Sequence, residues 1–310
     1  MTETPLPLVA LETVPASSWT APLVLSPTPE RTPTEEPSPT AIPSPTFTLT
    51  KTFTPTATVR PTLGPNEWQY LPIIPQVSET ARQIYRAGQV LGNDPHAFSI
   101  IGDCLSLPIN MFGNYGQPGR YNLGPFSHLQ PVIDWFQPSF RRISVTLRDG
   151  FNTAAVLSPL RADPKLCQPN ETPLVCEYRI HRPSYVFISI GTDDFGTPPE
   201  VYEKRMRQIV EYTISQGIVP ILATKADNRE GDHAFNRIVA QLAYEYDVPL
   251  WNFWAAVQPL KYGVLNDRGH LYWADPNHLE YQNSMMVAVP VRAATALQAL
   301  DAVWRGVTSP

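Results

Sequence analysis

Apolar and polar residues follow each other along residues 66–310 in blocks that predict strands and helices in turn. Continuous apolar runs, typical of strands covered on both faces, occupy residues 97–101, 184–190, 218–224 and 248–253, and residues 141–147 are a further candidate strand. Apolar residues spaced three or four positions apart predict helices over residues 79–91, 199–216, 232–246 and 291–306. Ser78 is a good N-cap for the first helix, and Gly217 ends the second.

Strands that alternate with helices predict the α/β class, with a five-stranded parallel sheet between two layers of helices. In the flavodoxin-like strand order 2-1-3-4-5, the first and third strands are neighbours. Ligands of such sheets bind outside the carboxyl ends of the strands, where the strand order reverses. Cys104 follows the first strand and Asp193 follows the third, so we expect these two residues to lie side by side.

Polar residues and glycines gather where the five predicted strands end. They are Gly102, Asp103 and Cys104 after the first strand, Asp149 and Gly150 after the second, Gly191, Thr192, Asp193 and Asp194 after the third, Lys225, Asp227 and Asn228 after the fourth, and Asn252 in the fifth. Because the carboxyl ends of parallel strands share one edge of the sheet, the sequence predicts a functional site at that edge.

The first 65 residues differ in composition from the rest of the chain. They hold 14 of its 35 prolines, 16 threonines and a single glycine, with no helical or strand period. Proline removes backbone donors, and the few apolar residues cannot offset the entropy lost on ordering the chain. We therefore expect residues 1–65 to be a disordered, extended Pro/Thr/Ser-rich stalk and residues 66–310 to be one domain.

Charge and hydropathy exclude several classes of partner. The net charge of −5 is mild, and no basic stripe suggests nucleic acid. No run reaches the roughly 20 apolar residues that span a bilayer, and the N-terminus lacks the basic and apolar regions of a secretory signal. A Pro/Thr stalk is nevertheless most familiar outside cells, so we expect an extracellular or cell-surface protein.

The chain has three cysteines. Cys167 and Cys176 bracket a short loop that contains prolines, and their spacing allows a local disulfide, which we expect over two unrelated thiols. A metal site is disfavoured because no second pair of ligands lies nearby, and no cofactor is implied. Cys104 remains as the odd thiol.

Four short motifs resemble those of the SGNH, or GDSL-type, hydrolases. They are IGDCLS at residues 101–106, Gly150 in RDGFNTAAVL, IGTDD at residues 190–194 and a late Asp-x-x-His unit. The resemblance covers residues 97–300, with the motifs in the family's order, and implies the three-layer α/β/α fold of an esterase. In that family a serine attacks an ester or amide carbonyl, a histidine accepts its proton, and an aspartate three residues earlier orients the histidine.

The resemblance also implies a role for individual residues. Cys104 would be the nucleophile, His270 the base and Asp267 its orienter, with Asp275 and His278 as an alternative pair. Gly150 and Asp193 would contribute to the oxyanion hole with the backbone N–H of Cys104. The residues expected to support the cleft are Asp103, Asp194, Lys225 and Asn228.

The sequence departs from the family pattern twice. Cys104 replaces serine, and a thiolate paired with histidine is a competent nucleophile. Asp193 replaces asparagine, and an ionised carboxylate offers no donor to the oxyanion, where losing one donor costs about 2.7–4 kcal/mol. Burial beside Asp194 would keep Asp193 protonated, or the amide of Asn228 or Asn252 would replace it.

Three functions follow from these residues. The first is an SGNH-like esterase that removes acyl groups from a small molecule or an extracellular polysaccharide. The second is an inactive SGNH-fold domain that binds carbohydrate or cell-envelope material. The third is a divalent-metal site for phosphoryl chemistry, built from Asp103, Asp193, Asp194 and Asp227, which is disfavoured because no phosphate-binding loop is present.

Overall fold

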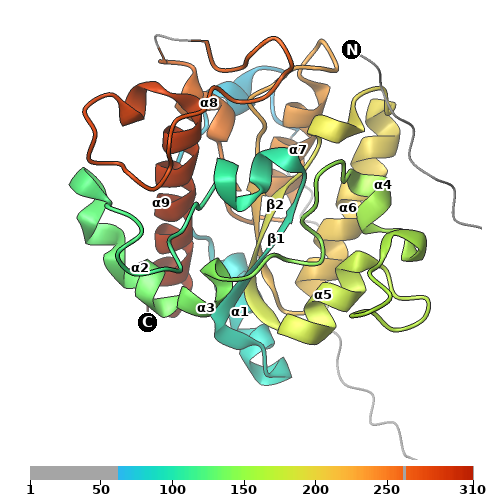
Figure 1. The fold of residues 1–310 in the computed structure, drawn as a ribbon. Helices are drawn as coiled ribbons and strands as arrows, with labels where there is room; N and C mark the ends of the chain where they lie inside the picture. Colours follow the sequence, from blue (N-terminus) through green and yellow to red (C-terminus); the bar gives the residue numbers. More distant parts are fainter. Residues whose placement is uncertain (1–61, 261–262, 310) are drawn as a thin grey trace, which may run out of the picture. The chain divides into compact units, whose positions relative to one another are not determined.

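The protein is described by a computed structural model that covers residues 62–260 and 263–309. Its centre is a parallel sheet of four strands in the order β1-β2-β3-β4. The strands are β1 (Asp94–Gly102), β2 (Pro183–Ser189), β3 (Val219–Ala223) and β4 (Leu250–Trp251). Figure 1 shows β1 and β2 in the middle of the domain, with α9 and α2 on one side of the view and α5 and α6 on the other. The α/β class and the parallel sheet are therefore confirmed.

The helices follow the predicted spacing of apolar residues. Ser78 accepts a hydrogen bond from the Ala81 N–H at the start of the first helix, and Gly92 ends it in the left-handed conformation. The helices are α1 (Glu79–Leu91), α2 (Gln130–Trp135), α3 (Gln137–Phe140), α4 (Thr153–Val156), α5 (Pro173–His181), α6 (Pro199–Ser215), α7 (Ala234–Glu245), α8 (Phe253–Val257) and α9 (Ala288–Thr308). The 3₁₀ turns are η1 (Glu67–Tyr70), η2 (Cys104–Ser106), η3 (Pro108–Asn110), η4 (Gly124–Leu129), η5 (Pro159–Arg161), η6 (Thr192–Asp194) and η7 (Ser284–Met286).

The predicted strand over residues 141–147 is wrong. This segment runs beside β1 but pairs with it only through one isolated bridge, between Gly102 and Leu147. Side chains replace the missing ladder at the edge of β1, since Ser144 Oγ accepts from the Ile100 N–H at 2.9 Å and Thr146 Oγ1 donates to the Ile100 carbonyl at 2.8 Å. Similar bonds join Ser139 Oγ to the Phe98 N–H and Arg142 to the Phe98 carbonyl. The edge of β1 is thus satisfied without a fifth strand.

A buried ion pair holds this segment against α5. The Glu177 side chain is fully buried, and its carboxylate lies 2.6 Å from the Arg142 guanidinium. It also accepts hydrogen bonds from the Ser99 hydroxyl of β1 and from the Val145 N–H. Every oxygen of this buried carboxylate therefore has a donor, which is what makes burial of a charge tolerable.

The N-terminal boundary of the domain touches the predicted stalk. Residues 1–61 of that stalk lie outside the described residues, and only residues 62–65 fall within them. The Leu63 N–H donates to Gln241 Oε1 at 2.9 Å, and Asn252 Nδ2 donates to the Trp68 carbonyl at 2.8 Å. Among the described residues, no helix combines the length and apolarity that crossing a membrane requires.

Candidate active site

The turn after β1 presents Cys104 at the edge of the sheet. Gly102 has no room for a side chain, because a Cβ there would lie 2.5 Å from the Cβ of Ser106. Ser106 is fully buried, and its hydroxyl donates to the Ser189 carbonyl of β2 at 3.0 Å. Ser106 is therefore out of reach of a substrate, whereas the Cys104 thiol is half-buried. Within the described residues no hydrogen bond occupies the Cys104 N–H, which leaves it available to an oxyanion.

Asp103 ties this turn to the end of β2. One carboxylate oxygen accepts from the Leu105 N–H at 3.0 Å, and the other accepts from the Thr192 N–H at 3.1 Å. Asp103 is buried, and burial raises its pKa to about 7 despite the attraction of Arg292. Asp103 therefore holds the turn after β1 against the loop after β2.

The glycine motif and the Gly-Thr-Asp-Asp motif are brought together. Asp194 is buried and accepts from both the N–H and the hydroxyl of Thr153, at 3.0 Å and 2.6 Å. Asn152 Nδ2 lies 3.5 Å from the Asp193 carbonyl. Gly150, which precedes this contact, is exposed in the turn after residue 149, and no described residue bonds its N–H. Neither Asp193 nor Asp194 caps α6, because that helix begins at Pro199 without a side-chain cap.

Asp193 has a carboxylate oxygen without a partner. Its Oδ2 is buried and has no hydrogen bond to any described residue. Burial raises the pKa of Asp193, and the negative charges of Asp149 and Asp227 raise it further, while Arg229 and His270 act in the opposite direction. A raised pKa favours the protonated carboxyl group, which can donate one hydrogen bond.

The surroundings of Cys104 are acidic. Burial raises the pKa of its thiol to about 12, and the neighbouring carboxylates of Asp103, Asp193 and Asp149 contribute to this rise. Cys104 and Asp193 are thus close enough for the negative charge of the carboxylate to disfavour the thiolate, in line with the expected strand order. Cys104 is a neutral thiol at pH 7, so any attack on a carbonyl needs a base to remove its proton.

Lys225 and Asp227 form a buried network behind this edge. The Lys225 ammonium lies 2.7 Å from Asp227 and 2.5 Å from Glu230, and Asp227 accepts from the Thr192 hydroxyl at 2.8 Å. All donors of Lys225 are therefore directed toward carboxylates or backbone inside the protein, so it supports the loops rather than a ligand.

The two asparagines considered as replacements for Asp193 have other partners. Asn228 Oδ1 accepts from the His233 N–H at 2.7 Å, at the start of α7. Asn252 is fully buried, and its amide donates to the carbonyls of Trp68 and Leu71. The proposal that Asn252 stands in for Asp193 is therefore wrong, because both of its amide hydrogens are committed elsewhere.

Neither candidate histidine is bonded to the aspartate three residues before it. Asp267 and His270 are both exposed in a tight turn, in which Asn266 N–H donates to the His270 carbonyl at 2.8 Å. Asp275 accepts from the N–H and the side-chain amide of Asn277. The roles implied for these four residues stay predictions.

His278 has a different carboxylate partner, Glu280, which the Asp-x-x-His spacing does not predict. Its Nδ1 lies 2.9 Å from Glu280 Oε1, and its ring stacks on Tyr281. The chain therefore contains a carboxylate–imidazole pair, but the acid follows the histidine by two residues. A signal was present in the sequence, because Glu280 is the acidic residue nearest to His278.

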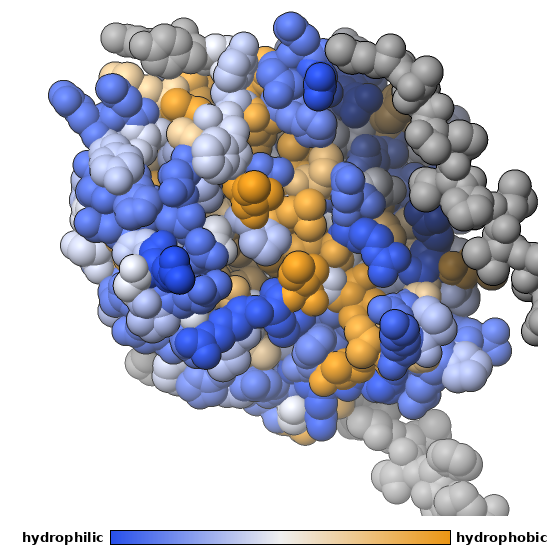
Figure 2. Space-filling view, viewed as in Figure 1, coloured by the Kyte–Doolittle hydropathy of each residue, from blue (hydrophilic) through white to orange (hydrophobic). Residues whose placement is uncertain are grey.

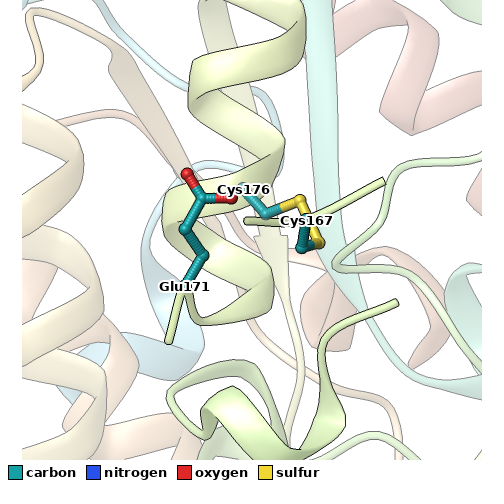
Figure 3. A group of neighbouring side chains, drawn as sticks. All are labelled: Cys167, Glu171 and Cys176. Carbon is teal, nitrogen blue, oxygen red and sulfur yellow. A yellow bond between two sulfur atoms is a disulfide. The ribbon is translucent and has the colours of Figure 1, made fainter. Parts of the chain in front are cut away.

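Cys167 and Cys176 are joined by a disulfide bond with an S–S distance of 2.07 Å (Figure 3). Glu171 lies close to both sulfur atoms, yet its carboxylate is bound to Arg179 at 2.5 Å. The sulfur atoms are bonded to each other and so are not thiolate ligands. This group is a staple between α5 and the loop before it.

No protein-family model matches the chain, and no curated protein matches it. Among solved structures, the fold is similar to the crystal structure of an acetyl xylan esterase, AlAXEase, with a TM-score of 0.38 and 14% sequence identity. The similarity covers 64% of this chain and 96% of that chain. At this TM-score and identity the likeness carries no argument about activity.

Proposed function

We propose that the domain is an ester hydrolase of the SGNH type, with the family's three-layer arrangement, and that Cys104 is its nucleophile. The observation that carries this proposal is the meeting of three family motifs at one edge of the sheet. Cys104, the turn at Gly150 and Asp193 lie together there, and no residue within 62–260 or 263–309 bonds to the N–H groups of Cys104 and Gly150. Two free N–H donors at one place suit a developing oxyanion.

In the proposed reaction the Cys104 sulfur attacks the ester carbonyl and its proton passes to a histidine. We assign that base to His270, whose charge is close enough to lower the pKa of Asp193 against the effect of burial. The same histidine returns the proton to the leaving alcohol. Water then hydrolyses the thioester, which releases the acid and restores the thiol. A protonated Asp193 would donate the third hydrogen bond to the oxyanion.

A second candidate function is binding of the same esters without cleavage. It is favoured by the raised pKa of Cys104, to about 12, and by the absence of an imidazole bonded to this thiol among the described residues. An acidic cleft of this kind would hold a neutral ligand by hydrogen bonds and ring stacking.

Acyl groups on polysaccharide fit the surface beside the site. Trp273 is 55% exposed, and its indole N–H donates to the Ile109 carbonyl, five residues after Cys104. Phe195 is 54% exposed and follows Asp193 and Asp194 directly. Figure 2 shows apolar residues reaching the surface between polar ones on the face in view. Exposed, fixed aromatic rings suit the apolar faces of sugar rings. With the disulfide, this substrate supports a proposal of extracellular or cell-surface placement.

Hydrolysis of a chromogenic acetyl ester by the full chain tests the proposal. Wild type, Cys104→Ala, Cys104→Ser, His270→Ala and His278→Ala are compared across pH, with His128→Ala as the control for loss of an exposed histidine. Turnover that is lost in Cys104→Ala and His270→Ala, but kept in the control, supports the thiol mechanism. Loss in His278→Ala with retention in His270→Ala would move the base to His278. An inert wild type that binds acetylated polysaccharide would favour the second function.

A further inference from the structure

A buried arginine of α9 lies under the candidate site. Arg292 is the one charged residue between Ala288 and Leu300, and it is 1% exposed. Burial lowers its pKa to about 10, although Asp103, Cys104 and Asp227 act in the opposite direction. Removing a guanidinium from water is costly unless its donors are bonded, so a buried arginine without an ion pair needs a reason.

The contacts of Arg292 join two strand ends. Its Nη2 donates to Ser189 Oγ at 2.7 Å and to Ser106 Oγ at 3.1 Å. The guanidinium carbon lies 4.6 Å from the ring centroid of Phe253 and 5.1 Å from that of Trp251, within the range of cation–π attraction. Its Nε has no partner among the described residues. The guanidinium is thus held by two hydroxyl groups and two ring faces, and no carboxylate of the described part of the chain forms an ion pair with it.

We propose that Arg292 is a positioning residue for the candidate site, which fixes the turn that presents Cys104 relative to the end of β2 that leads to Asp193. Ser106 lies two residues after Cys104, and Ser189 lies four residues before Asp193. One guanidinium therefore fixes the distance between the turn that carries Cys104 and the strand end that leads to Asp193. Its positive charge also opposes the ring of carboxylates around the thiol. A role of Arg292 in catalysis rests on the proposed function. The contacts of Arg292 with Ser106 and Ser189 do not depend on that function.

The test measures alkylation of Cys104 by iodoacetamide, which needs no ester hydrolysis. Arg292→Met removes the charge and both hydrogen bonds, Arg292→Lys keeps the charge, and Arg305→Met removes an exposed arginine of the same helix as a control. An opposite charge nearby lowers the pKa of a thiol by about 1–3 units, so removing it lowers the thiolate fraction of Cys104. The more basic thiolate is also more nucleophilic, which offsets part of this loss. Arg292→Met should therefore slow alkylation about 3- to 30-fold at pH 8. Arg292→Lys should recover most of the rate, and the control should match wild type.

A merely structural role would lower the melting temperature of Arg292→Met and leave the alkylation rate against pH unchanged, which would overturn the proposal. If Arg292→Met does not fold, Arg292→Gln takes its place, since it removes the charge but keeps a side-chain N–H that can reach Ser189. Unchanged alkylation in Arg292→Gln would also overturn the proposal.

Ester hydrolysis, measured on the same samples, separates the two proposals. An inert wild type with Arg292-dependent alkylation contradicts the proposed function alone. Hydrolysis together with Arg292-independent alkylation contradicts the positioning role alone.

Discussion

The acidic surroundings of Cys104 predict a thiol that reacts slowly in the native protein. With a pKa of about 12, the thiolate fraction at pH 7 is on the order of one in 100,000. An unperturbed cysteine, with a pKa of about 8.5, has a thiolate fraction of roughly 3% at the same pH. The thiolate population of Cys104 is therefore about 3,000-fold lower than that of an ordinary cysteine.

Nucleophilicity offsets part of this difference. A more basic thiolate attacks faster, and a Brønsted coefficient of about 0.4–0.5 over roughly 3.5 pKa units returns about 30-fold. We therefore expect native Cys104 to react with iodoacetamide about 100-fold more slowly than an ordinary cysteine at pH 7. The rate should rise nearly tenfold for each pH unit up to at least pH 10, without a plateau, because the thiolate fraction is still increasing there.

Intact-mass measurements follow this reaction directly, since Cys104 is the free cysteine and the other two form a disulfide. The same chain unfolded in guanidinium without reductant gives the reference rate for an ordinary thiol. Asp149→Asn should raise the native rate, because it removes one of the carboxylates that raise the thiol pKa. A native rate equal to the unfolded rate, or a plateau below pH 9, would refute the reasoning and would indicate a cation or imidazole beside the sulfur.

Three further predictions concern stability. Glu177→Gln removes the charge of a fully buried carboxylate that accepts hydrogen bonds from Arg142, and should lower the free energy of unfolding by about 1–3 kcal/mol in denaturant titrations. The exposed Glu79→Gln should change it by less than about 1 kcal/mol, and equal effects would contradict this. The pKa of Asp103 is about 7 in the folded state and lies above its unfolded value, so protonated Asp103 favours folding below about pH 4. The free energy of unfolding should fall by about 4 kcal/mol as pH rises from 4 to 7, and Asp103→Asn should abolish this decline. Replacing both Cys167 and Cys176 by serine should lower the unfolding free energy by about 2–3 kcal/mol for this short loop, and a smaller change than about 1 kcal/mol would show that the staple is dispensable.

Much of the fold could be predicted because its signals are local. Continuous apolar runs mark strands that are buried on both faces, and β2 is buried along its whole length. The start of α1 could be predicted because Ser78 acts through its own hydrogen bond to the Ala81 N–H rather than through distant contacts.

The segment over residues 141–147 shows where local signals fail. Its alternation of Ile143, Val145 and Leu147 with Ser144 and Thr146 suits a strand. The hydroxyl groups of that alternation, however, bond to the backbone of β1 and so take the place of a ladder. An edge strand can be covered by another strand or by side-chain hydroxyl groups. The choice depends on tertiary contacts, among them the ion pair of Arg142 with the buried Glu177.

The placement of the motifs at the strand ends could be predicted, but the bonding partners of their side chains could not. The motifs indicated which residues share the edge of the sheet, because loops after parallel strands converge there. The bonding partners of these residues were not visible in the sequence, since Glu280 binds His278 at 2.9 Å and Arg292 reaches the site from the last helix. The Asp-x-x-His spacing predicts which aspartate pairs with the histidine, but the fold determines which carboxylate binds the imidazole, here Glu280 at His278.

The acidic surroundings of Cys104 shift the question of activity from the nucleophile to the base. The carboxylates that disfavour a thiolate at Cys104 would favour an imidazolium beside it, because negative charge raises both pKa values. Proton transfer from thiol to histidine creates one charge of each sign, so these two effects largely cancel within a closely placed pair. The repulsion between the oxyanion and the same carboxylates is not cancelled. Stabilising the oxyanion therefore needs Asp193 in its protonated form. Turnover therefore requires a histidine at the sulfur and a neutral Asp193 together, and a cleft with neither would bind its ester without cleaving it.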